Sequence, residues 1–337
     1  MSRAFQGTAS YTGSALATPN VVNLRDAYSG CTNMVGSPYC GNFTTNLHGA
    51  YLNCTKITGA PVCGPNVESL AYAYYNCKNL TGSPVCGAKV INMSEAYTSS
   101  GVSGNAVCGS AVVNLHAAYR NCRNITGNPI CGSNVANMAW AYGDCSNITG
   151  TPVISSKVTN FAHAYANCVK LTGKPVCPTS GLVDFNFTYY GCTNLTGSPV
   201  TSENVSGMRY TYFNCAKLTG RPVIGNNVVQ ADYSYCGCVN LNQGPIIGKN
   251  VVNLRYAFQS DYNLGGNSYI YSNNLNDVWY AFRRTGSGPF NRLNVYFHAN
   301  TTTSDSIIGA KSQNASTSIT GFVMGFTNHA NGAMSVW

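Results

Sequence analysis

Cysteine and tyrosine are the residues of this chain whose types and spacing could support chemistry. The stretch AYYNCKNLTGSPVCG, residues 73–87, places Tyr74 three positions before Cys77, and Cys86 nine positions after Cys77. Similar stretches recur along the 337 residues, which include 16 cysteines and 23 tyrosines. Thiols at a repeated spacing serve as metal ligands, as disulfide partners or as small buried side chains.

The two cysteines of a repeat do not vary together, which argues against a disulfide within the repeat. Ser100 replaces the first cysteine of one repeat while Cys108 is kept, and Ile224 replaces the second cysteine of another while Cys215 is kept. Equivalent residues of stacked repeats would lie ~4.8 Å apart, just beyond the Cβ separation of a disulfide, about 3.5–4.5 Å. We therefore expect most cysteines to be reduced and to pack as small apolar side chains.

The remaining reactive residues indicate neither a metal site nor catalysis. The sequence contains no CxxC or HExxH motif, and its single CxC pair is Cys236 and Cys238. His48 and His116 occupy the same position three repeats apart, too far to share a metal. The 10 acidic residues are scattered, and no GxSxG, GxGxxG or P-loop motif occurs. We expect no catalytic residue, no metal and no cofactor.

The charge pattern disfavours nucleic acid and membranes as partners. The net charge is +9, from 19 Lys and Arg against 10 Asp and Glu, but the basic residues lie singly except for Arg283 and Arg284. No apolar run approaches the ~18 residues of a membrane span. The N-terminal stretch has no apolar core of a signal peptide, so the sequence favours folding in a cytoplasm.

An internal repeat of 22–25 residues positions these side chains, and about twelve copies run from residue 20 to about residue 297. Each copy carries an aromatic residue at one position. This aromatic column comprises Tyr28, Tyr51, Tyr74, Tyr97, Tyr119, Tyr142, Tyr165, Tyr189, Tyr212, Tyr235, Phe258 and Phe282. A repeat of this length cannot bury its apolar side alone, so we expect the copies to stack around one continuous core.

Within a repeat, the spacing predicts a short helix followed by a very short strand. Leu70, Tyr74 and Cys77 are spaced i, i+4, i+7, which is one face of two helical turns. Gly and Pro then end the helix, and the apolar pair Val85 and Cys86 predicts the strand, with the inward-facing member of the pair left open.

The pattern resembles the BspA-like leucine-rich repeats, in which an apolar residue is followed by Ala-aromatic, a Cys three positions on, then Leu and a short strand. Residues 158–176, VTNFAHAYANCVKLTGKPV, carry all of these positions, and the resemblance covers roughly four-fifths of the chain. It implies an α/β solenoid, a leucine-rich-repeat-like stack of about twelve units. The family places Pro just after the strand, whereas Pro84 precedes the apolar pair.

One position varies freely inside this frame and is a candidate binding row. It lies just before Pro, at the edge of the predicted strand. The candidate ligand- or partner-binding residues there are Ser83, Asn105, Asn128, Thr151, Lys174, Ser198 and Arg221. Variation on a rigid repeat frame is how repeat proteins build binding surfaces, and plain solvent exposure is the alternative.

The ends of the chain depart from the repeat and predict separate parts. We expect an N-terminal cap at residues 1–19, the solenoid at 20–297 and a C-terminal β-type cap or docking hairpin at 298–337, where Asn331-Gly332 signals a hairpin. Apolar residues on both faces of this hairpin would leave one face for a partner. The candidate docking residues are Phe322, Met324, Phe326 and Trp337.

These observations favour a non-enzymatic structural or binding protein. The resemblance and the expected cytoplasmic folding with reduced thiols point to a virion protein assembled in the host cytoplasm, as a tail-fibre, receptor-binding or capsid-decorating component. Its partners would be other virion proteins or copies of itself, with a host-surface glycan or protein as a further partner. The alternatives are a bacterial or protist cell-surface adhesin and an intracellular protein-binding scaffold.

Overall fold

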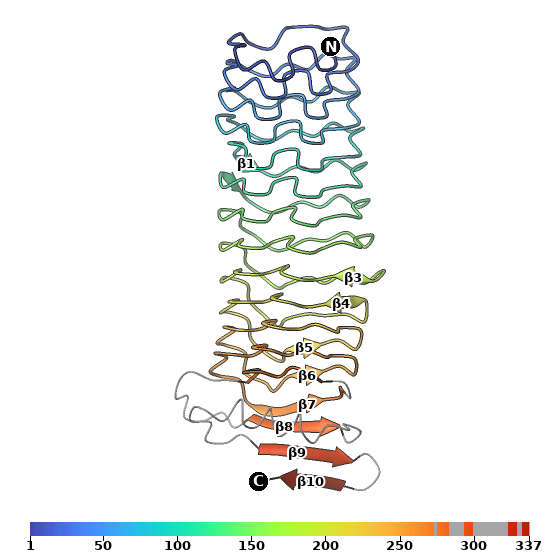
Figure 1. Ribbon diagram of the computed structural model, residues 1–337, viewed down its shortest axis with the longest axis vertical. Coiled ribbons are helices and arrows are strands. Elements are labelled where there is room, and N and C mark those ends of the chain that lie inside the picture. Colours follow the sequence, from blue (N-terminus) through green and yellow to red (C-terminus); the bar gives the residue numbers. More distant parts are fainter. Residues whose placement is uncertain (273–274, 283–292, 299–322, 329–331, 337) are drawn as a thin grey trace. The chain divides into compact units, whose positions relative to one another are not determined.

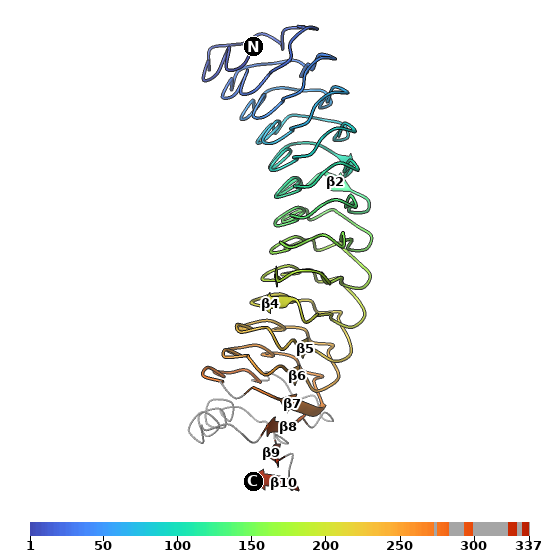
Figure 2. The same cartoon turned by 90° about the vertical axis from the view of Figure 1, so that its right-hand side faces the viewer.

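A computed structural model of the chain describes residues 1–272, 275–282, 293–298, 323–328 and 332–336, the last three ranges by their backbone alone. The chain divides into two compact units, Met1–Leu171 (unit 1) and Thr172–Trp337 (unit 2). Within each unit every repeat forms one coil, and successive coils lie side by side in both views of the molecule (Figures 1 and 2). Backbone hydrogen bonds join equivalent residues of adjacent coils.

The predicted helix is wrong: the segment from Leu70 to Cys77 is a series of turns, and no helix occurs among the described residues. The N–H groups of Ala73 and Cys77 donate to carbonyls three residues back in the same coil. The alternate N–H groups donate to the next coil, as from Tyr74 to the carbonyl of Ala96 at 2.8 Å. An α-helix would instead use every N–H within its own segment, four residues back.

The close spacing of the coils explains why turns replace helices. Equivalent tyrosine rings of adjacent coils, such as Tyr51 and Tyr74, stack with their centroids 5.6 Å apart. Packed helices need about 8–10 Å between their axes, so a helix in every coil could not fit this rise. The turns still direct the expected side chains inward, and Leu70, Tyr74 and Cys77 are all fully buried.

Each turn segment places two residues in the left-handed backbone region. In the coil of Leu70 these are Tyr72 (φ 56°) and Asn76 (φ 58°), and the equivalents in the other coils also have positive φ. A positive φ at the third residue is the mark of a type II turn. Gly and Asn adopt this conformation readily, whereas a bulky residue such as Tyr72 does so only when its surroundings enforce it.

The strands are short and lie mostly in unit 2. Unit 1 contains the parallel pair β1 (Gly104–Asn105) and β2 (Ile125–Thr126). Unit 2 contains the parallel pair β3 (Val183–Asp184) and β4 (Val205–Gly207), and a six-stranded sheet in the order β10-β9-β8-β7-β6-β5. The predicted strand at the apolar pair is therefore found at β5 (Val223–Ile224) and β6 (Ile246–Ile247), but not at Val85 and Cys86 of unit 1.

The C-terminal strands extend the sheet of unit 2. β7 (Gly266–Ile270), β8 (Leu293–His298) and β9 (Val323–Asn328) continue it in parallel, and β10 (Gly332–Val336) pairs antiparallel with β9. The antiparallel pair agrees with the hairpin expected at residues 298–337, although Gly332 lies in β10 and residue 331 lies outside the described residues. This C-terminal segment is joined by backbone pairing to the strands of the last coils (Figure 1).

The N-terminal segment, residues 1–19, carries the same turns as the repeats. The N–H groups of Arg3, Phe5 and Gly7 donate to the coil of Tyr28, and the ring of Phe5 stacks on Tyr28 with centroids 5.3 Å apart. The segment thus covers the first ring of the aromatic column in unit 1.

Candidate binding surfaces

The buried tyrosine hydroxyls close each coil on itself. Tyr142 is fully buried, and its ring stacks on those of Tyr119 and Tyr165, with centroids 5.5 and 5.6 Å apart. Its hydroxyl donates to the carbonyl of Ile130 (2.5 Å) and accepts from the N–H of Ile130 (3.0 Å). The same pair of hydrogen bonds, to the backbone of the residue twelve or thirteen positions earlier, recurs at the column tyrosines from Tyr51 to Tyr212. The tyrosine column therefore has a structural role.

Strand pairing takes over this role where the column changes to phenylalanine. Phe258 has no hydroxyl, and the residue twelve positions earlier, Ile246, donates its N–H to the carbonyl of Pro222 in the neighbouring coil (3.0 Å). The sheet begins one coil earlier, at β5, where the hydroxyl of Tyr235, the last tyrosine of the column, still donates to the carbonyl of Val223 (2.7 Å). The backbone groups of this segment find partners by either route, as buried amides must.

The first cysteine of each repeat is a buried hydrogen-bond donor. The Cys54 thiol donates to the carbonyl of Tyr28 in the preceding coil (3.0 Å), and Cys145 donates to Tyr119 (2.8 Å). Burial raises the pKa of Cys54 to about 12. A thiol bound in this way is protonated and unreactive at neutral pH, so these cysteines stabilise the stack rather than act as nucleophiles.

The second cysteine of each repeat is half-buried and accepts a hydrogen bond. Cys86 accepts from the N–H of Gly109 in the next coil (3.3 Å), and burial raises its pKa to about 11. All sixteen cysteines are free, which agrees with the expected reduced thiols. Across the described residues, no group of three His, Cys, Asp or Glu side chains could hold a metal ion, and no helix is long and apolar enough to cross a membrane.

The variable row lies on the surface over most of its length. Six of its seven predicted residues are exposed, namely Ser83, Asn105, Asn128, Thr151, Lys174 and Ser198. Arg221 is half-buried, and its guanidinium donates to the carbonyl of Asn267 (3.1 Å). A left-handed glycine of the next coil lies over five of the variable residues, as Gly220 lies over Ser198, so a side chain added at these glycines would displace the variable residue. The five are Ser83, Asn105, Asn128, Lys174 and Ser198. The binding role of this row remains a prediction.

A second row of aromatic residues, outside the core, runs along the turn segments of unit 2. We call it the outer aromatic strip. Its members are Phe187, Tyr190, Tyr210, Phe213, Tyr233, Tyr256, Trp279 and Tyr280. Tyr210 stacks on Phe187 at 4.8 Å and on Tyr233 at 4.5 Å, and Tyr233 stacks on Tyr256 at 4.7 Å. The rings are half-buried except that of Trp279, which is exposed.

Five of the eight strip residues occupy the first left-handed position of their coils. Tyr210, Tyr233 and Tyr256 have φ of 53°, 56° and 54°. One coil of unit 1 has a glycine, Gly49, at this position, and its other coils have non-glycine residues there at positive φ. An L-residue in this region costs roughly 1–2 kcal/mol. Ion pairs border the strip, such as Arg209 with the buried carboxylate of Asp232 at 2.9 Å.

The outer aromatic strip was not predicted from the sequence, although a signal was present. Aromatic residues occur two positions before the column residue in five successive repeats, as in RYTYF, residues 209–213, and VWYAF, residues 278–282. If the segment were a helix, the residue two positions before the column residue would lie on the solvent side, and its ring would not stack on those of adjacent repeats. Only the turn geometry brings these rings into register along the unit.

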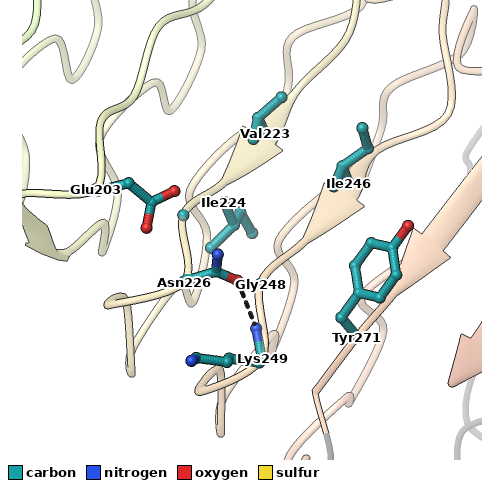
Figure 3. A pocket seen from close by; sticks show the side chains of 9 residues that line it. Glu203, Val223, Ile224, Asn226, Ile246, Gly248, Lys249 and Tyr271 are labelled. Atoms are coloured by element: carbon teal, nitrogen blue, oxygen red, sulfur yellow. Dashed lines mark hydrogen bonds between the residues drawn. The ribbon is translucent and has the colours of Figure 1, made fainter.

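A groove of about 490 Å³ lies over the outer side of β5 and β6. Figure 3 shows Val223 and Ile246 on the two strands, with Glu203 on one side and Tyr271 on the other. Lys249 also lines the groove, and its backbone N–H donates to the Asn226 side chain (3.2 Å). An apolar floor with a few polar groups is typical of small-ligand sites.

The other residues singled out from the sequence are not gathered into a site. His48 lies beside Tyr72, and His163 stacks on Trp140 at 3.9 Å, so both are half-buried members of side-chain stacks. Of the predicted docking residues, Met324 and Phe326 lie in β9, where only the backbone is described. Phe322 and Trp337 lie outside the described residues.

Comparison with protein-family models, with curated proteins and with solved structures gave no match.

Proposed function

We propose that this chain is a non-enzymatic binding protein whose rigid coils present the outer aromatic strip to another protein. Stacked aromatic rings held in left-handed backbone positions carry this proposal. Residues in such conformations persist where the surrounding structure enforces them, and they cluster at functional sites. Tyr, Phe, Trp and Arg, the residues of the strip and its border, are also enriched at protein interfaces.

The assembly that we propose is a virion, with the chain as a tail-fibre, receptor-binding or capsid-decorating component. The thiol hydrogen bonds support folding in a reducing compartment such as a host cytoplasm, because oxidised cysteines could not donate them. A cell-surface adhesin, the alternative from the sequence, would fold its thiols under oxidising conditions. We further infer that the coils are a helix-free relative of the BspA-like leucine-rich repeat, on the strength of the shared residue order.

A saccharide is a second candidate ligand, favoured by the groove over β5 and β6. The apolar side chains of Val223 and Ile246 offer a floor for the carbon face of a sugar ring, and Glu203, Asn226 and Lys249 offer hydrogen-bonding groups around it. This arrangement agrees with the host-surface glycan expected as a further partner.

The test separates the binding role of the strip from a structural one. Particles and membrane fractions from cultures that express the chain are inventoried by mass spectrometry, and we expect the chain in the particles. The triple variant Tyr210→Gly, Tyr233→Gly, Tyr256→Gly supplies the residue that the backbone prefers, which offsets part of the lost ring stacking, so we expect the chain to stay folded with a lowered melting temperature but to be lost from the particles. Recovery in membranes would contradict the virion assignment, and normal incorporation of the variant would contradict the role of the strip.

A further inference from the structure

One coil of unit 1 is a residue shorter than its neighbours. In the preceding repeat, Lys78 and Asn79 stand between Cys77 and the buried Leu80; in this repeat Gly101 alone stands between Ser100 and the buried Val102. Gly101 is required at this place, because its N–H donates to the carbonyl of Cys77 and an added Cβ would run into the backbone of Lys78.

The missing residue removes one side chain from a row of asparagines. The asparagine at this position reaches the preceding coil, as Asn147 donates to the carbonyl of Arg123 (2.7 Å) and Asn124 to that of Gly101 (3.4 Å). The short coil has no asparagine at this position, and the surface there has a notch of about 310 Å³. The notch therefore arises from a specific deletion in the repeat.

Two cations flank this notch on the coils at either side. Lys78 and Arg123 hold the same position as Gly101 in the coils before and after it, roughly 10 Å apart at ~4.8 Å per coil, and both are exposed. Asn121 accepts from the Nε of Arg123 (3.0 Å) and is itself bound to Ser99 (3.1 Å). These two hydrogen bonds orient the guanidinium of Arg123 through its Nε and leave the two terminal nitrogens for a ligand. Among the described residues that line the notch, none is acidic.

We propose that this notch binds an oxyanion group, sulfate or phosphate, either as the free ion or as a substituent of a polysaccharide. A pre-oriented guanidinium, an ammonium group and amide N–H donors around one opening match the charge and the several acceptor oxygens of such a group. The site lies in unit 1 and shares no residue with the outer aromatic strip, so its test is independent of the test of the proposed function.

The test follows the backbone amide signals of Ser99, Gly101 and Asn124, which line the notch, by NMR in the full-length chain while sodium sulfate or phosphate is added at constant ionic strength. We expect a saturable shift, with affinity about tenfold weaker in Arg123→Gln and in Lys78→Gln, since each removes one charge-assisted contact. Lys157→Gln is the matched control: this lysine is bound to Asn134 elsewhere in unit 1, and its loss should leave the affinity unchanged.

Restoring the deleted residue tests the notch itself. An asparagine inserted between Gly101 and Val102 should fill the notch and abolish the saturable shift while the chain stays folded. A response linear in salt, an equal loss in Lys157→Gln or retained binding in the insertion variant would each overturn the proposal. Sulfated dextran against uncharged dextran then distinguishes the source: tighter binding of the sulfated polymer than of sulfate assigns a polysaccharide, and binding of the ion alone assigns a free oxyanion.

Discussion

The hydroxyl of a column tyrosine takes the place of a strand partner in the coils where strands do not form. Removing the hydroxyl from Tyr142 should leave the N–H and the carbonyl of Ile130 without their hydrogen-bond partner. Tyr142→Phe should therefore lower the free energy of unfolding by about 1–3 kcal/mol. Tyr142→Ala should cost about 3–5 kcal/mol, because the whole ring is lost. Urea denaturation measures both changes.

The reverse substitution in unit 2 is the control for this role. Phe258→Tyr should gain no stability, because Ile246 already donates its N–H to Pro222. A cost for Tyr142→Phe below about 0.5 kcal/mol, the usual range of neutral surface changes, would show that the hydroxyl is not needed.

The buried thiols should make the protein sensitive to alkali. Burial raises the pKa of Cys54 and of Cys131 to about 12, above the value of about 8.5 for a thiol in the unfolded chain. Below about pH 8.5 both states hold the proton and the full stability is present; above it the unfolded chain releases protons first. We expect the free energy of unfolding, measured in reductant, to be level from pH 6 to 8 and to fall as pH rises towards 10.

Each such thiol contributes a slope of about 1.4 kcal/mol per pH unit. The variant Cys54→Ser carries a hydroxyl that does not titrate in this range, so its loss of stability between pH 9 and 10 should be smaller by that amount. Stability that stays level to pH 10 in the unaltered chain would contradict the protonated ladder of thiols.

At the scale of the element, the sequence predicts the buried face but not the backbone. The spacing of Leu70, Tyr74 and Cys77 identifies three buried side chains, because both a helix and this series of turns return to the same side after four and seven residues. Periodicity cannot distinguish the two. The distinguishing signal is the row of Asn and Gly before each first cysteine, as at Asn76 and Gly191, since both residues favour the left-handed conformation and Gly weakens a helix.

Substitution in that row tests the turn against the helix by the sign of the effect. Asn214 is exposed and has a φ of 59°. In a helix Ala is more stable than Gly by about 0.8–1 kcal/mol, whereas at positive φ Gly is more stable by about 1 kcal/mol or more. We expect Asn214→Gly to unfold at a higher urea concentration than Asn214→Ala. The opposite order would indicate a helical backbone at this position.

The candidate sites depended on features that a single repeat does not display. The variable row could be predicted because it is visible as variation at one position, and six of its seven residues do lie on the surface. The aromatic residues of the outer aromatic strip and the shortened repeat are visible in the sequence, but the two surfaces are not, because each arises only when coils stack.

Within each unit the coils are joined by backbone, hydroxyl and thiol hydrogen bonds, and none of the sixteen cysteines forms a disulfide. The thiol hydrogen bonds need reduced cysteines, which supports the proposed folding in a reducing compartment.

The most direct test of the central claim is a count of free thiols. The natively assembled protein is denatured without reductant, alkylated and weighed as an intact chain. We expect the mass to show labels on most of the sixteen cysteines. A chain that takes up so few labels that six or more disulfides must be present would contradict the thiol ladder and, with it, the inferred folding in a reducing compartment.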